Sequence, residues 1–250
     1  MKTFNDLPMH TRRSMTYAGI GHRDLGGFKE PNTNEPVENV MAWIAGELEK
    51  LGYTLNSGGA KGADSAFEYG VKDAAHKNVF RATDATEETR AIAQELHPAH
   101  ERLQGHALDL YARNTNQIFG RNLDMVVDFV VCYTKDGCES HTARTRDSGG
   151  TGQAIEMATR KGAVVFNMKN ADWFVRLKKF LRESGTLPAD YAFELPLGNF
   201  PKIPAEVVAF TPQKKNDLHG SANAAHKTAP KSAPAMSAKQ IKALMKAAKR

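Results

Sequence analysis

The chain has 250 residues, of which 41% are hydrophobic and 25% charged, and its formal net charge is +6. These values are ordinary for a globular protein, and the length allows one sizeable domain with appendages. The first residues lack the apolar segment of a signal peptide, and no apolar run approaches a membrane span. The only cysteines, Cys132 and Cys138, fall in an apolar strand pattern and in a loop. We therefore expect a reduced, cytoplasmic protein with no membrane partner.

Residues 1–210 alternate between strand and helix patterns. The alternation predicts a Rossmann-like, doubly wound α/β domain with a mainly parallel sheet and helices on both faces. An extended, proline-containing segment at residues 186–210 is expected to pack on this domain. Strands are predicted, in chain order, at residues 15–21, 53–56, 78–82, 126–132 and 162–167. Helices are predicted at residues 38–51, about 64 to 71, 86–96, 98–122, after Gly152, and at 172–181. Gly105 and Gly120 can interrupt the long helix at residues 98–122.

The positive charge is concentrated at the C-terminal end. Residues 211–250 hold nine basic residues and one acidic residue, a net charge of +8, which leaves about −2 for residues 1–210. Their Ala, Ser, Pro and Lys content predicts a flexible tail, and a capping-box pattern at residues 237–240 predicts a short terminal helix. The tail is either a solubilising appendage or a basic arm that binds nucleic-acid phosphates. The cations of such an arm near the C-terminus are Lys239, Lys242, Lys246, Lys249 and Arg250.

Three predicted strands run into glycine-containing loops. These loops are Gly-Ile-Gly-His-Arg at residues 19–23, Ser-Gly-Gly-Ala-Lys-Gly-Ala-Asp at residues 57–64, and Ser-Gly-Gly-Thr-Gly at residues 148–152. Parallel strands emit their loops from one edge, where open α/β sheets bind ligands. Glycines admit a ligand close to the backbone, and unpaired amides at a helix N-terminus suit a phosphate. The loops therefore predict a site for a nucleotide or nucleotide-derived small molecule.

We expect one cleft to gather the residues of these loops, with Lys61 or Arg23 as the countercharge for phosphate. No cofactor and no metal are predicted, because His97, His100 and His106 have no carboxylate-rich partner set. The polar segment at residues 134–148 precedes the last glycine loop, and it is either a lid, with Arg144 and Arg146 facing phosphates, or a mobile surface excursion. The predicted ligand-binding residues are Gly21, Arg23, Gly58, Gly59, Lys61, Asp64, Gly149, Gly150, Thr151 and Gly152.

The ordered set of glycine loops, together with Arg121-Asn122, resembles the SLOG superfamily over roughly residues 15–181. This group joins the DNA-processing protein DprA (Smf) to the Lonely Guy (LOG) phosphoribohydrolases, and the pattern also looks like uncharacterised DprA-like proteins of bacteriophages. The resemblance implies a nucleotide-binding protein that forms homo-oligomers. A DprA-like recombination mediator, binding single-stranded DNA through the core loops or the tail, is an alternative, although the core is slightly acidic.

A second alternative is a LOG-like enzyme that cleaves the N-glycosidic bond of a nucleoside monophosphate. In that family a Gly-Gly-X-Gly-Thr motif is followed by a glutamate, with an arginine on the preceding helix; here Glu156 and Arg121 occupy the corresponding positions as candidate catalytic residues. A carboxylate stabilises an oxocarbenium-like sugar, and an arginine steadies phosphate or the leaving base. Ser148 and Gln153 depart from the proline and threonine of the family pattern. Glu156 is equally explained as an acid favoured near a helix N-terminus.

Overall fold

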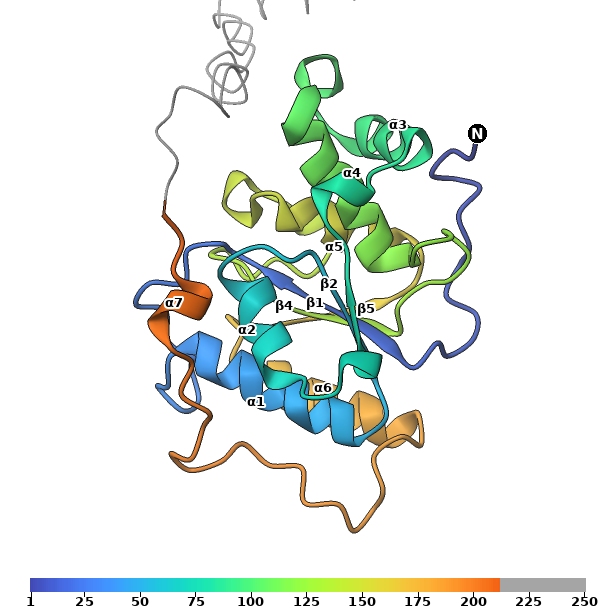
Figure 1. Ribbon diagram of the computed structural model, residues 1–250. Helices are drawn as coiled ribbons and strands as arrows, with labels where there is room; N and C mark the ends of the chain where they lie inside the picture. Colours follow the sequence, from blue (N-terminus) through green and yellow to red (C-terminus); the bar gives the residue numbers. More distant parts are fainter. Residues whose placement is uncertain (212–250) are drawn as a thin grey trace, which may run out of the picture. The chain divides into compact units, whose positions relative to one another are not determined.

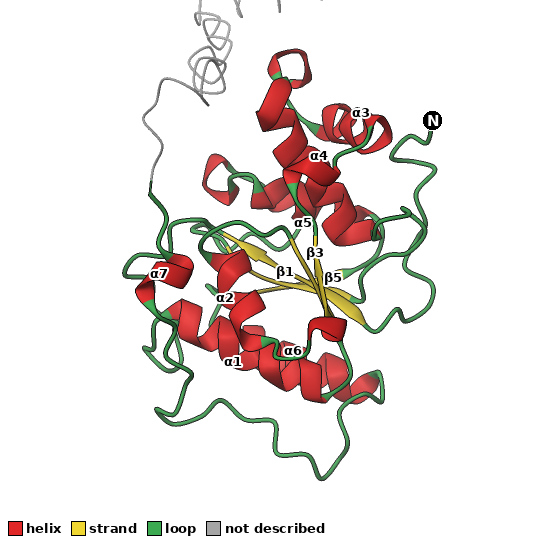
Figure 2. Cartoon of the chain, viewed as in Figure 1, coloured by secondary structure: helices red, strands yellow, loops and turns green. Residues whose placement is uncertain are grey.

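The fold is built on one sheet of five parallel strands, in the order β3-β2-β1-β4-β5. The computed structural model describes residues 1–211, and the basic tail, apart from Thr211, lies outside the described residues. The predicted Rossmann-like α/β fold with a parallel sheet is confirmed, with helices on both sides of the strands (Figure 2). The strands are β1 (Thr16–Gly21), β2 (Thr54–Ser57), β3 (Lys77–Val79), β4 (Phe129–Tyr133) and β5 (Val164–Asn167).

Two hydrophobic clusters lie on opposite faces of the sheet, because successive strand side chains point to opposite sides. Tyr17 and Phe129 join one cluster, whereas Ala18 and Val130, the next residue of each strand, join the other. The first cluster packs under α1 (Val37–Lys50), α2 (Ala63–Gly70) and α6 (Trp173–Glu183). The opposite face is covered by α3 (Glu87–Leu96), α4 (Gly105–Phe119) and α5 (Thr151–Arg160) (Figure 1).

The long helix predicted at residues 98–122 is shorter in the structure. A 3-10 turn occupies His100–Arg102, α4 begins at Gly105, and it ends at Phe119. Gly105, the first residue of α4, and Gly120, the residue after it, have φ values of +56° and +72°, which the interior of an α-helix does not allow. The apolar residues at helical spacing therefore continue beyond both ends of α4, and the two glycines set the boundaries of the helix.

The segment after α6 runs extended around α1, as the prolines predict, and it includes the single turn α7 (Ala205–Val208). The ring of Trp43 on α1 lies 6.0 Å from both Phe193 and Phe200 of this segment, centroid to centroid. The hydroxyl of Tyr191 donates a 2.9 Å hydrogen bond to Glu47 on the same helix. No helix within residues 1–211 combines the length and the apolar character that crossing a membrane requires.

The packing of α1 against α2 generates the first prediction. A Cβ atom added to Gly70 would collide with the Ala42 carbonyl and lie 2.8 Å from the Ala45 Cβ. Because backbone cannot yield as a flexible side chain can, Gly70→Ala should lower the free energy of unfolding by about 1 to 3 kcal/mol. Urea denaturation measures this change. Gly26→Ala is the control, since the only close atom there belongs to the Asp24 side chain; equal stabilities of the two variants would contradict the packing account.

Candidate functional site

The candidate site lies at the topological switch point between β1 and β4. These neighbouring strands send their following loops to opposite faces of the sheet, the first toward α1 and the second toward α5. The His22 amide donates to the Tyr133 carbonyl at 3.2 Å, and His22 Nε2 lies 3.1 Å from the Asp147 carbonyl. The two loops are thereby joined at the position where open α/β sheets bind ligands.

The N-terminus of α5 presents free backbone donors at this point. Gly150 is the N-cap residue, and no side chain caps the helix. Within the described part of the chain, no atom accepts a hydrogen bond from the amides of Gly150 and Thr151. The nearest atom to a Cβ built on Gly150 is the Tyr111 hydroxyl oxygen, 4.0 Å away, so space remains in front of this turn. Free amides, the helix dipole and open space together suit an anion.

The glycine loop between β2 and α2 packs directly on the loop after β1. The Ala63 amide donates to the His22 carbonyl at 3.0 Å. Gly62 has a φ of +83°, and a Cβ there would collide with the Arg23 carbonyl. Gly21 is equally confined, since its Cβ would lie 2.8 Å from the Ala63 Cβ. These two glycines let the loops touch, and the contact brings all three predicted glycine loops to one edge of the sheet.

A buried ion pair lies beneath the β2–α2 loop. The Arg113 side chain comes from α4 on the opposite face, and its Nη1 donates to the Gly58 carbonyl. Its Nη2 lies 3.7 Å from Asp64 Oδ2 at the start of α2. Arg113 and Asp64 are only 9% and 4% exposed, and Arg113 Nε is buried without an acceptor. Burial raises the pKa of Asp64 to about 6, against the opposing effect of the Arg113 charge.

Arg23 adds a second cation to this cluster. No residue between positions 1 and 211 accepts a hydrogen bond from the Arg23 guanidinium. Its charge interacts with those of Arg113 and Asp64, and with Tyr111. Burial, followed by repulsion from Arg113, lowers the pKa of Arg23, although an arginine remains charged at neutral pH. The cluster therefore holds two guanidinium groups and the Asp64 carboxylate, with the Glu68 carboxylate close enough to raise the pKa of Asp64 as well.

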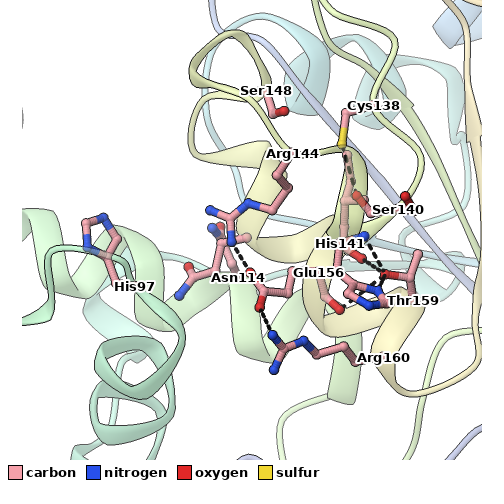
Figure 3. A network of polar contacts seen from close by, with 12 residues as sticks. His97, Asn114, Cys138, Ser140, His141, Arg144, Ser148, Glu156, Thr159 and Arg160 are labelled. Carbon is pink, nitrogen blue, oxygen red and sulfur yellow. Dashed lines mark hydrogen bonds and ion pairs between the residues drawn. The ribbon is translucent and has the colours of Figure 1, made fainter. Parts of the chain in front are cut away.

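Glu156 and Arg121, the predicted catalytic residues, have different partners. The Glu156 carboxylate on α5 is paired with Arg144 through Oε2 and with Arg160 through Oε1, the second pair at 2.8 Å (Figure 3). Arg121 follows α4, lies 3.4 Å from Asp84, and stands over the Phe80 ring beside the edge strand β3. The structure thus places Glu156 in an ion-pair network on α5. Arg121 lies near β3, at the edge of the sheet on the other side of β1 from β4 and β5.

Two further predicted residues point away from the cation cluster. Gly59 faces the end of β3, where a Cβ would lie 3.0 Å from Val79 and 3.4 Å from Arg81. The Lys61 ammonium group donates to the carbonyls of Glu206 and Val207 in α7, at 2.8 and 3.1 Å. Arg23 is consequently the predicted countercharge that lies in the site, whereas Lys61 is bound to α7. Gly152 packs against Ser148 and Arg144, where a Cβ would lie 2.8 and 3.0 Å away.

Sequence reasoning missed Arg113 and its neighbour Asn114. Asn114 Nδ2 donates to the Gly150 carbonyl at 3.3 Å, so both residues of this Arg-Asn pair contact glycine loops. The same dipeptide occurs at residues 121–122, which was the one assigned to the family pattern. The repetition itself was a usable signal. Residues 113 and 114 lie within α4 and contact the glycine loops, whereas residues 121 and 122 follow the end of the helix.

The segment at residues 134–148 forms a hydrogen-bonded wall of the site. Asp136 accepts hydrogen bonds from the hydroxyls of Thr145 and Ser148 at 2.5 and 2.6 Å. Burial opposes the ionisation of Asp136, but the hydrogen bonds, first among them the one from Ser148, lower its pKa to about 2. Asn167 Nδ2 donates to Thr134 and to the Cys138 carbonyl, which ties the segment to β5. These contacts favour a fixed wall over a mobile excursion.

Residues 22–23, 58–64, 111–114 and 149–152 are called the switch-point site below. Across residues 1–211, no three His, Cys, Asp or Glu side chains gather where they could hold a metal ion. No known family model, curated protein or solved structure matches the chain. The function is therefore inferred from the geometry of the switch-point site.

The raised pKa of Asp64 generates a pH prediction. The pKa of Asp64 is about 6 in the folded protein and has its ordinary value of 3.8 in the unfolded chain. The folded state binds more protons between these values, so Asp64 lowers stability progressively as pH rises from about 4 to 6. Asp64→Asn removes this effect. The stability of the variant relative to the parent should increase by roughly 2 to 3 kcal/mol over that interval.

Urea denaturation of both proteins at pH 4, 5, 6 and 7 measures this difference. Asp109→Asn is the matched control, because Asp109 pairs with Arg90 at 2.7 Å while both side chains remain partly accessible. A stability difference between Asp64→Asn and the parent that does not change with pH would contradict the raised pKa of Asp64 and show that the Arg113 charge offsets the effect of burial.

Proposed function

We propose that the switch-point site binds the phosphate of a nucleotide or nucleotide-derived ligand. The observation that supports this most directly is Arg23, a partly buried cation with no acceptor among the described residues, on the loop that His22 joins to the segment before the unpaired amides of α5. A phosphate satisfies both sets of donors at once, through charge-assisted hydrogen bonds. Arg113 supports the site from below, and Asp64 compensates part of the buried charge.

A nucleotide is preferred to inorganic phosphate for two reasons. The site occupies the switch point of a Rossmann-like sheet, where dinucleotides and mononucleotides bind in many proteins of this architecture. The glycine loops also resemble those of the SLOG superfamily, whose members recognise nucleotides. Fold and motif thus indicate the class of ligand by analogy, and the base is left to experiment.

The contacts of Glu156 favour binding over glycosidic hydrolysis. A catalytic carboxylate must reach the sugar or an attacking water. Both oxygens of Glu156 are engaged by arginines, and Arg121 stands beside β3. Incubation with a panel of nucleoside monophosphates, followed by mass spectrometry, separates the possibilities: intact nucleotide retained by the protein supports a binding function, and release of free base supports the enzyme.

Single-stranded DNA is the second candidate ligand, favoured by the position of α7. Lys61 joins α7 to the glycine loop after β2, and the cationic residues beyond position 211 follow α7 closely in the chain. The cations of residues 211–250 would attract the phosphates of a single strand whatever its sequence.

Gly150→Val tests the phosphate site directly. The open space at Gly150 and its φ of −64° accommodate a side chain, so the stability should change by less than about 1 kcal/mol. The added methyl groups would occupy the position of the phosphate, and AMP affinity measured by calorimetry should fall at least ~10-fold. Arg23→Ala should weaken AMP binding similarly, whereas Arg12→Ala, an exposed arginine of the N-terminal segment, should not. Unchanged affinity in Gly150→Val would contradict the proposal.

Truncation after Phe210 tests the second candidate. Nine cations are removed, so affinity for a single-stranded oligonucleotide should fall more than ~10-fold at moderate salt. The slope of log affinity against log salt should also become shallower, by ~0.7 for each phosphate that is no longer neutralised by a cation of the tail. Fluorescence anisotropy at several salt concentrations measures both. Equal affinities and slopes for the two proteins would assign DNA binding to residues 1–210.

A further inference from the structure

Lys61 belongs to a glycine loop of the switch-point site, but it is bound elsewhere. Its ammonium group caps α7, a single turn whose last carbonyls have no partners within the helix. A cation at a helix C-terminus is stabilising, and here it accounts for the polar contact between α7 and the loop. α7 therefore competes for a cation that the loop would otherwise present to an anion.

The packing of α7 is otherwise slight. None of its residues is buried, and Val208 is its only partly buried residue packed against the core. The extended segment before it is anchored independently, since the Ile203 amide donates to Asn39 at 3.1 Å and Phe200 packs on Trp43. α7 can leave the loop without loss of these anchors, so its release requires little of the domain to change.

Lys61 directly precedes Gly62, which lies against the Arg23 carbonyl. The flexible four-carbon stem of lysine allows its ammonium group to be redirected without movement of the backbone. We propose that α7 is an autoinhibitory segment: a phosphate bound at the switch-point site takes Lys61 from the Glu206 and Val207 carbonyls and thereby releases α7. This inference rests on the proposed phosphate-binding function. Because coupling between two equilibria is reciprocal, displacement of α7 must also strengthen phosphate binding.

The full-length protein with AMP as the probe tests the exchange. Saturating AMP should increase hydrogen–deuterium exchange at the hydrogen-bonded amides of Val207 and Ala209, while residues around Trp43 stay protected. Val208→Asp removes the apolar contact of α7 and should raise AMP affinity about 5-fold, the lower range of allosteric coupling. Leu197→Asp is the matched control on the same extended segment, because Leu197 is fully exposed; its AMP affinity should equal that of the parent.

Lys61→Met separates the two roles of the lysine. This variant should show high exchange at the Val207 and Ala209 amides without AMP, and AMP should bind it more weakly than the parent. Parent protein that binds AMP with no change in exchange, together with unchanged affinity in Val208→Asp, would overturn the autoinhibitory exchange and leave the phosphate site intact. Failure of the parent to bind AMP, or any other nucleotide of the panel, would overturn both proposals.

Discussion

The contact of Arg113 with the Gly58 carbonyl and the Asp64 carboxylate is the interaction on which the site depends. It joins α4, on one face of the sheet, to the loop that begins α2 on the other face. A Cβ on Gly58 would lie 2.6 Å from the Arg113 guanidinium carbon and 2.7 Å from Asp64 Oδ2, so both partners of the ion pair would have to move. A buried ion pair adds little net stability when its desolvation is counted. Its main effect is geometric: it fixes the β2–α2 loop, and the loop in turn supports Arg23.

The charge balance of the site follows from this arrangement. The Asp64 carboxylate lies among the charges of Arg113, Glu68 and Arg23, and burial shifts the pKa values of Asp64 and Arg23 in the directions that favour their neutral forms. Perturbed charges of this kind collect at functional sites, although structural ion-pair networks produce them too. In the Arg144–Glu156–Arg160 network beside the site, each oxygen of Glu156 has its own cation.

The glycines of the three loops act in different ways. Gly21 and Gly62 are required by close packing of protein on protein, because a Cβ at either position would strike a neighbouring loop. Gly150 has no such neighbour, and it leaves open space before the free amides of α5. A glycine motif in a sequence therefore mixes positions that shape the scaffold with positions that admit a ligand, and only the surrounding atoms distinguish them.

The sequence by itself determined the fold class, the five parallel strands and the edge of the sheet where the loops gather, because these follow from local periodicity and from the rule that parallel strands emit loops on one side. It also predicted that Arg23 lies on one of these loops. Tertiary structure alone decided the partners of long side chains. Lys61 reaches α7, Arg121 reaches Asp84, and Glu156 is enclosed by Arg144 and Arg160. Arg113 became visible only when α4 was placed against the β2 loop. A local motif predicts where a loop lies relative to its strand and helix. The partner of a long charged side chain depends on which residues the tertiary packing brings within its reach.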